Sequence, residues 1–309
     1  MGNCINLDKN LTHTLDFTDL DWEDLFGNFT ENYGEGDDYT CTEPCQYTYC
    51  SVFSSSIPAF LAVAGTLGLL CNMALVITLA KYPLFWGKRH AGKTKIFLMA
   101  TAAAVFGAVL PFLAVEMGPG QIFGDNFCPV ARALKYGCVF AQGLLVAGSA
   151  WKMSWRFPGL LLPIVLWLVG FLCGIPAGIS SSTGEFCIPS QEVELYPWSL
   201  AHTIICLVVF VILPLAMILV KAVLKWDGYS SPIDVTWLFY LFWVPYGVAL
   251  ILGELRQKDL VICMCHFQER LDYFLGLSEG LGILHCCLCP VLILGFGFCR
   301  QRDVQADKC

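Results

Sequence analysis

The chain has 309 residues, of which 57% are hydrophobic and 14% charged, with a formal net charge of −7 and a mean hydropathy of +0.64. A soluble globular domain averages roughly 45–50% apolar and 25% charged residues, so the composition excludes an ordinary soluble domain. The apolar residues fall in long runs, several of them at least as long as the roughly 18 residues that indicate a membrane span.

Seven such runs predict an all-α membrane protein, a seven-transmembrane helix bundle. The third run carries Arg132 and Lys135 near its start, and prolines lie inside or near the ends of several runs. A membrane helix tolerates such prolines when its neighbours satisfy the freed backbone groups. The predicted spans are 57–80, 96–115, about 128–150, about 157–180, 197–220, about 235–253 and about 273–298.

Basic residues between the runs predict the orientation. The segment 81–95 holds five Lys or Arg and no acid, whereas the intervening segments on the other side lean acidic. By the positive-inside rule the N-terminus is extracellular and residues 299–309 form a short cytoplasmic tail. We therefore divide the chain into an extracellular tail (1–56), a bundle (57–298) and that cytoplasmic tail.

The extracellular tail is strongly acidic. Residues 1–50 contain eleven Asp or Glu against one Lys and few apolar residues, so we expect disorder in isolation. An acidic tail of this kind can simply be a solvated segment without a binding role. The alternative is that its negative charge attracts a basic ligand and raises the rate of encounter with it. Tyr33 and Tyr39 lie among acids and are candidates for sulfation. The sequons at Asn10 and Asn28 are candidates for N-glycosylation.

The chain has 17 cysteines, and the outer ones are disulfide candidates because the extracellular space is oxidising. Cys128 begins the third span and Cys187 lies in the loop after the fourth, so a bridge between them would hold that loop over the bundle. A second bridge would join the tail to the loop before the seventh span. We favour Cys45 with Cys265, but spacing alone leaves Cys41, Cys50 and Cys263 as alternatives.

The stretch "HCCLCP" (285–290) raises the question of a metal site. In a helix only His285 and Cys289 share a face, whereas zinc requires about four converging ligands. We expect small, packable side chains in the seventh span and no metal or cofactor.

Several motifs resemble those of rhodopsin-like seven-helix receptors: Trp167, Pro214, "FWVPY" (242–246) and "HCCLCP". The motifs "LPFLA" (110–114) and "SEGLGILHCCL" (278–288) are similar to chemokine receptors. The stretches "LDFTDLDWED", "FAQGLLVAG", "HTIICLVVFVILPLA" and "FWVPYGVALILGELRQK" are similar to the atypical branch of that family.

That resemblance implies a basic chemokine ligand gripped in two parts. The tail would hold the folded body of the chemokine, and Glu279, one turn into the seventh span, would face its flexible N-terminus. A structural pair of Glu279 with Arg132 or Lys135 is the alternative, because buried charges are usually paired. The candidate tail residues are Asp19, Asp21, Trp22, Glu23, Asp24, Tyr33, Asp37, Asp38 and Tyr39.

The chain departs from signalling receptors of that family at its inner half. Where signalling receptors carry Asp-Arg-Tyr at the end of the third span, this chain has "KMS" (Lys152, Met153 and Ser154). Where they carry Asn-Pro-x-x-Tyr in the seventh span, it has "CPVLI" (289–293). Asn72, in the first span, is kept. Intramembrane polar groups are costly unless functional, so their joint loss favours a bundle without a G-protein switch. The other substituted positions are Ala103, Ala222, Cys289 and Ile293.

We therefore predict an atypical chemokine receptor that binds CC and CXC chemokines promiscuously and acts as a sink, scavenger or transcytosis receptor. The alternatives are a G-protein-coupled chemokine receptor with degenerate motifs, and a membrane transporter. No phosphate loop, HExxH or GxSxG motif indicates an enzyme. We expect a multi-pass protein of the plasma membrane and endosomes, in a lipid bilayer, as a homodimer or a heterodimer with other chemokine receptors. We expect no nucleic-acid partner and no G-protein coupling.

Overall fold

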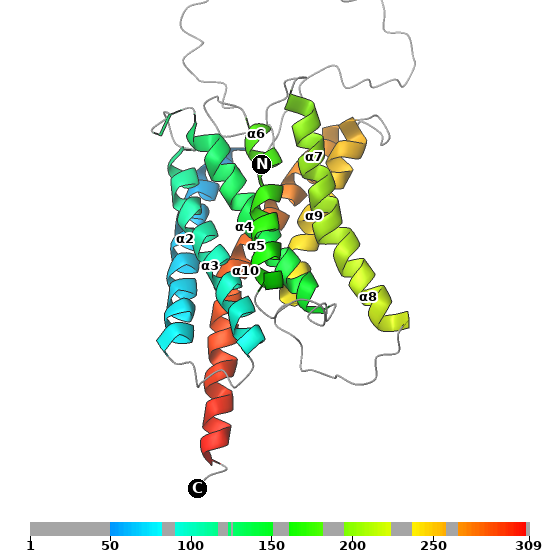
Figure 1. Cartoon of the computed structure of the whole chain (residues 1–309). Helices are drawn as coiled ribbons and strands as arrows, with labels where there is room; N and C mark the ends of the chain where they lie inside the picture. The colour runs from blue at the N-terminus through cyan, green and yellow to red at the C-terminus, as the bar shows by residue number, and fades with distance from the viewer. Residues whose placement is uncertain are drawn as a thin grey trace, which may run out of the picture.

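The computed structural model describes residues 50–81, 90–116, 123–124, 126–150, 161–181, 195–223, 237–257 and 265–306. Within these ranges the chain is almost entirely helical, and seven stretches are long and apolar enough to cross a membrane. Figure 1 shows the helices side by side as one bundle. The predicted seven-helix fold is confirmed, including the third and seventh spans, which carry charged residues.

The helix bounds extend several of the predicted spans. The first begins seven residues before position 57, because the helix continues through the polar run ahead of Ile57. The helices are α2 (Cys50–Lys81), α3 (His90–Glu116), α4 (Phe127–Ala150), α5 (Leu161–Cys173), α6 (Ile175–Ile179), α7 (Tyr196–Cys206), the π-helix η5 (Leu207–Ile212), α8 (Leu213–Val223), α9 (Trp237–Gln257) and α10 (Cys265–Ala306).

Polarity is distributed as in a membrane protein, with apolar side chains outside and polar ones inside. Leu70, Leu219 and Leu241 expose 61%, 63% and 68% of their surface, whereas Asn72 and Gln142 each expose 2%. Exposed leucines on this scale would be an aggregation hazard in water but are solvated by lipid tails. The outer surface therefore contacts the bilayer, and the bundle interior is where polar chemistry is available.

Glycines allow α4 and α5 to approach backbone to backbone. A Cβ built on Gly170 would lie 2.3 Å from the Cα of Ala141, and one on Gly174 would lie 2.3 Å from the carbonyl oxygen of Ala133. With Gly178 these residues follow the small-xxx-small spacing that lets membrane helices pack closely. We call this backbone contact, formed at Gly170, Gly174 and Gly178, the α4–α5 seam. It holds α4, which carries Arg132 and Lys135, against the rest of the bundle.

Prolines account for the irregular turns. Pro176 lies in the first turn of α6, where its missing N–H costs no helical bond, just after the break at Gly174. Pro214 follows the π-helix η5 and cannot donate to the carbonyl four residues earlier, so the turn before it widens. Pro111 and Pro245 lie inside α3 and α9. Of these irregular turns, the π-helix η5 directly follows α7, which carries His202.

The last helix is longer than the predicted seventh span. α10 begins at Cys265, eight residues before the predicted start at 273, and continues to Ala306. Figure 1 shows it running past the C-terminal end of α2 and the N-terminal end of α3. Its spanning part, Phe267–Gly295, contains both Glu279 and His285.

Candidate functional site

Two groups of side chains in the bundle bear on function. We name the outer group the mouth cluster (Arg132, Lys135, Tyr136, His202 and Glu279) and the inner group the inner cavity. The mouth cluster brings together α4, α7 and α10, and the inner cavity brings together α2, α3, α4 and α10.

A buried ion pair is the centre of the mouth cluster. The Lys135 ammonium donates to a carboxylate oxygen of Glu279, and the two side chains expose only 10% and 4% of their surface. Arg132 lies three residues before Lys135 on α4, which places both on one helix face. Of the two partners considered for Glu279, the structure pairs it with Lys135. Whether Glu279 also contacts a ligand remains a prediction.

An aromatic layer packs below this pair. The Tyr136 and Tyr246 hydroxyls are hydrogen-bonded at 2.7 Å, and the His202 ring lies 4.5 Å from the Tyr136 ring, centroid to centroid. Phe210 and Trp243 stack beneath at 5.6 Å and are fully buried. The mouth cluster therefore rests on a densely packed floor built from α4, α7, η5 and α9.

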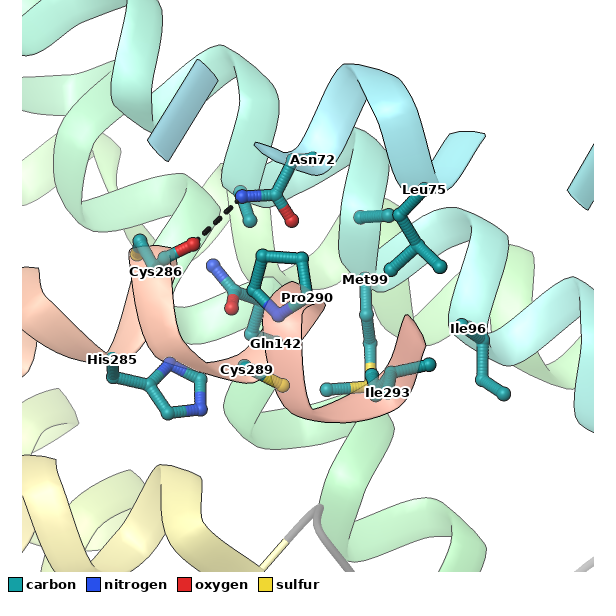
Figure 2. Close-up of a pocket in the computed structure, with 12 residues that line it drawn as sticks. Asn72, Leu75, Ile96, Met99, Gln142, His285, Cys286, Cys289, Pro290 and Ile293 are labelled. Carbon is teal, nitrogen blue, oxygen red and sulfur yellow. Dashed lines mark hydrogen bonds between the residues drawn. The ribbon is translucent and has the colours of Figure 1, made fainter. Parts of the chain in front are cut away.

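The inner cavity has a volume of about 30 Å³ and gathers most of the intramembrane positions at which this chain departs from signalling receptors. Ala103, Cys289 and Ile293, distant in sequence, all line it, as Figure 2 shows for the two α10 residues. None of its lining residues carries a carboxylate, an ammonium or a guanidinium. They are Asn72, Leu75, Ile96, Met99, Ala100, Ala103, Gln142, His285, Cys286, Cys289, Pro290 and Ile293.

Asn72 joins α2 to α10 at the edge of this cavity. Its amide donates to the carbonyl oxygen of Cys286 at 2.8 Å, as Figure 2 shows, and to that of Gly68, also at 2.8 Å. A second link lies one turn further out, where the Cys287 thiol donates to the carbonyl oxygen of Ala64 at 3.2 Å. Because all these acceptors are backbone groups, the α2–α10 contact does not depend on a partner side chain that could switch.

The stretch "HCCLCP" forms part of these packing contacts. His285 packs edge-on against Phe239 at 5.5 Å, and Cys286, Cys287 and Cys289 are free thiols. Within the described ranges no three His, Cys, Asp or Glu side chains gather in a way that could hold a metal ion. His285 and Cys289 line the inner cavity together, as their four-residue spacing predicts.

Other predicted residues are described in part. Cys128 is disulfide-bonded, and the side chain bonded to it lies outside the described part of the chain, so its pairing with Cys187 stays a prediction. Ala222 lies in α8, and only its backbone is described, as for Cys50 and Cys265. The predicted residues outside the described ranges are Asn10, Asp19, Asp21, Trp22, Glu23, Asp24, Asn28, Tyr33, Asp37, Asp38, Tyr39, Cys41, Cys45, Lys152, Met153, Ser154, Cys187 and Cys263.

Sequence reasoning missed three contributors. Gln142, His202 and the Tyr136–Tyr246 pair are buried polar groups, of which the tyrosine pair joins α4 to α9, and none was singled out from the sequence. A signal existed for the first two, because a polar residue within a hydrophobic span usually faces the bundle interior. The tyrosine pair depends on a contact between positions 110 residues apart, which composition does not reveal.

Comparison with known proteins gives near full-length matches. No family model matches the chain. It is 31% identical to atypical chemokine receptor 1 of Gorilla gorilla gorilla over 96% of this chain and 91% of the relative. The human protein of that name is 30% identical over 97% of this chain and 92% of the relative. The Bos taurus protein is 31% identical over 95% of this chain and 90% of the relative. These near full-length matches, with seven helices that could span a membrane, show that the chain belongs to the chemokine-receptor family that includes atypical chemokine receptor 1.

Proposed function

We propose that the chain is an atypical chemokine receptor of the Duffy antigen type, which binds CC and CXC chemokines promiscuously without activating G proteins. The observation that carries this proposal is the near full-length similarity to relatives named atypical chemokine receptor 1. Receptors of this kind take up, display or transport their ligands. The proposal therefore includes a role as sink, scavenger or transcytosis receptor at the plasma membrane and in endosomes.

The inner cavity supports the absence of signalling. Activation of a helical bundle needs an element with two arrangements of similar free energy. At Ala103 and Ile293 the cavity wall offers side chains without hydrogen-bonding groups, and at Cys289 a weakly polar thiol, so these positions offer few hydrogen bonds that could be exchanged between two states. Among the described residues, the hydrogen bonds of the Asn72 side chain go to backbone carbonyls of its own helix and of α10. The interior thus favours one arrangement of α2, α3 and α10.

The mouth cluster supports chemokine binding that depends mainly on the N-terminal tail. Glu279 is already neutralised by Lys135 and exposes 3% of its surface, so little of its charge is available to a basic ligand. By contrast, residues 1–50 carry eleven acids against one lysine. Such a charge raises the encounter rate with a basic partner and can select by charge rather than by shape, which suits a promiscuous receptor.

A truncation tests whether the N-terminal tail binds the chemokine. A chain that begins at residue 41 retains Cys41, Cys45 and Cys50 but loses ten of the eleven tail acids and Tyr33 and Tyr39. We expect labelled CC and CXC chemokines to bind cells expressing the full chain, and to bind the truncated chain at least about tenfold more weakly. Binding to the full chain should also weaken as salt is added.

Glu279→Gln is the matched comparison, since it removes one acid from the bundle and none from the tail. If Glu279→Gln reaches the cell surface at the level of the full chain and abolishes binding, while the truncation at residue 41 leaves binding unchanged, the binding site is in the bundle and the tail proposal is wrong. Absence of binding to well-expressed full chain at the cell surface would reject the chemokine ligand altogether.

A further inference from the structure

Three aromatic rings meet where α3 ends and α4 begins. The Phe123 ring lies 5.8 Å from the Phe112 ring and 4.7 Å from the Phe127 ring, centroid to centroid, and the last two rings are 6.4 Å apart. We call these three side chains the phenylalanine triad. Phe112 belongs to α3 and Phe127 opens α4, whereas Phe123 lies in the connection between them. A residue of the connection thus packs back onto two membrane-spanning helices.

A tight turn directs Phe123 toward Phe112. Gly124 has a φ of +78°, which favours glycine, and its carbonyl oxygen accepts a hydrogen bond from the Phe127 N–H at 3.1 Å. A Cβ built on Gly124 would meet no described atom within 4 Å, so the turn is open on that side. The turn leads directly into Cys128, which is disulfide-bonded.

The phenylalanine triad is exposed and continues the lipid-facing surface of α3 and α4. Phe112 exposes 50% of its surface and Phe123 exposes 40%. Phe112 shares a helix face with Val115, and Phe127 shares one with Val130, and both valines are exposed. Phe112 and the two valines lie within stretches that can span the membrane, so their exposed surface faces acyl chains. The Phe123 ring extends this apolar surface beyond the helices.

The depth of Phe123 follows from helix geometry. The span of α3 ends at Glu116, four residues after Phe112, which at about 1.5 Å per residue places Phe112 about 6 Å inside the boundary of the span. The Phe123 ring contacts the Phe112 ring and therefore lies at a similar depth. Segments that lie in the membrane interface bury their apolar side chains about 5–10 Å deep. Phe123 is thus at the level of the upper acyl chains.

We propose that the turn at Gly124 docks onto the lipid surface, with Phe123 inserted among the upper acyl chains of the leaflet at this end of the bundle. The three rings carry no hydrogen-bonding group, so their contact with lipid leaves no polar side-chain atom without a partner. The polar side chain of Asn126, exposed in the same turn, stays in the hydrated headgroup layer. Because Cys128 follows directly, the inserted turn fixes the disulfide-bonded start of α4, and with it the height of the mouth cluster in the membrane.

Photolabelling of the full chain in nanodiscs tests this insertion without any chemokine, so its outcome is independent of the proposed receptor function. Two phosphatidylcholines are compared, one with a diazirine near the top of an acyl chain and one with the diazirine at the chain end. Peptide mass spectrometry then locates the adducts. We expect the upper-chain probe to label Phe123 at least about threefold more than the chain-end probe does. Val208, exposed midway along the span Tyr196–Val220, should show the opposite preference, and the buried Val139 should stay unlabelled.

The labelling pattern also decides what covers the phenylalanine triad. Absence of Phe123 adducts with both lipids, while Val208 is labelled, would overturn the proposal. If Phe123 is labelled only in the chain that begins at residue 41, the N-terminal tail covers the triad in place of lipid and the proposal is wrong. The same probe preference at Phe123 and Val208 would contradict insertion at the level of the upper acyl chains.

Two charge substitutions test the insertion by a second measurement. Phe123→Asp should lower the thermal unfolding midpoint in nanodiscs by at least about 3 °C, because a carboxylate is costly among acyl chains. Asn126→Asp adds the same charge to an exposed residue of the same turn and should leave the midpoint unchanged. Equal midpoints in the unsubstituted chain and Phe123→Asp, or an equal fall in both variants, would contradict the insertion of Phe123.

Discussion

Lys135→Met is expected to lower the free energy of unfolding by about 3–5 kcal/mol, because it leaves the Glu279 carboxylate buried without its partner. The pair joins α4 to α10 across the bundle, so the loss should appear as global unfolding at lower denaturant. SDS titration of the receptor from mixed micelles, followed by circular dichroism, measures it.

The double variant Lys135→Met/Glu279→Gln is the control for this prediction. It removes both charges and should recover most of the lost stability, since an apolar replacement of a buried pair is often neutral. Glu279→Gln alone should cost at least as much as Lys135→Met, because it leaves Arg132 and Lys135 with no carboxylate between them. Additive effects of the two single substitutions would show that the pair contributes little.

Gly170→Leu is expected to prevent assembly of the bundle. The new Cβ would lie 2.3 Å and 2.4 Å from the Cα and nitrogen of Ala141, which are backbone atoms that cannot rotate away. α4 and α5 must separate, and overpacking of this kind costs about 3 kcal/mol or more. We expect surface expression to fall by at least about tenfold, measured by flow cytometry with an epitope tag.

Gly295→Leu provides the matched control. It makes the same substitution in a spanning helix, at a lipid-facing position where nothing lies within 4 Å of the new Cβ. Leucine also has a higher helix propensity than glycine, so expression should be unchanged or slightly higher. Equal loss in both variants would mean that added bulk anywhere in a span is harmful and that the α4–α5 seam has no special role.

Hydropathy was sufficient to predict the fold, because lipid demands long apolar helices and little else satisfies the backbone there. It predicted even the third and seventh spans, in which Arg132, Lys135 and Glu279 lie inside the bundle rather than against lipid. It did not predict the break at Gly174, the π-helix before Pro214 or the early start of α10. Those features depend on backbone contacts and polar helical turns, which a hydropathy average does not register.

The candidate site was predictable in part. The spacing of Arg132 and Lys135, and a glutamate within the seventh span, gave a buried charge pair as the alternative to ligand binding by Glu279 and left its partner open; the structure shows Lys135 as the partner. The positions Ala103, Cys289 and Ile293 were recognised one by one. Only the fold shows that they line one cavity next to Asn72. The tail residues expected to grip the ligand lie outside the described ranges, so their role is still a prediction.

The most direct test of the central claim is to measure chemokine binding and nucleotide exchange on heterotrimeric G proteins in the same membranes. A signalling chemokine receptor at equal density is the positive control. The proposed function predicts saturable binding of both CC and CXC chemokines to this chain, with exchange at the level of receptor-free membranes. Chemokine-stimulated exchange that follows receptor occupancy would contradict it and establish a signalling receptor with degenerate motifs.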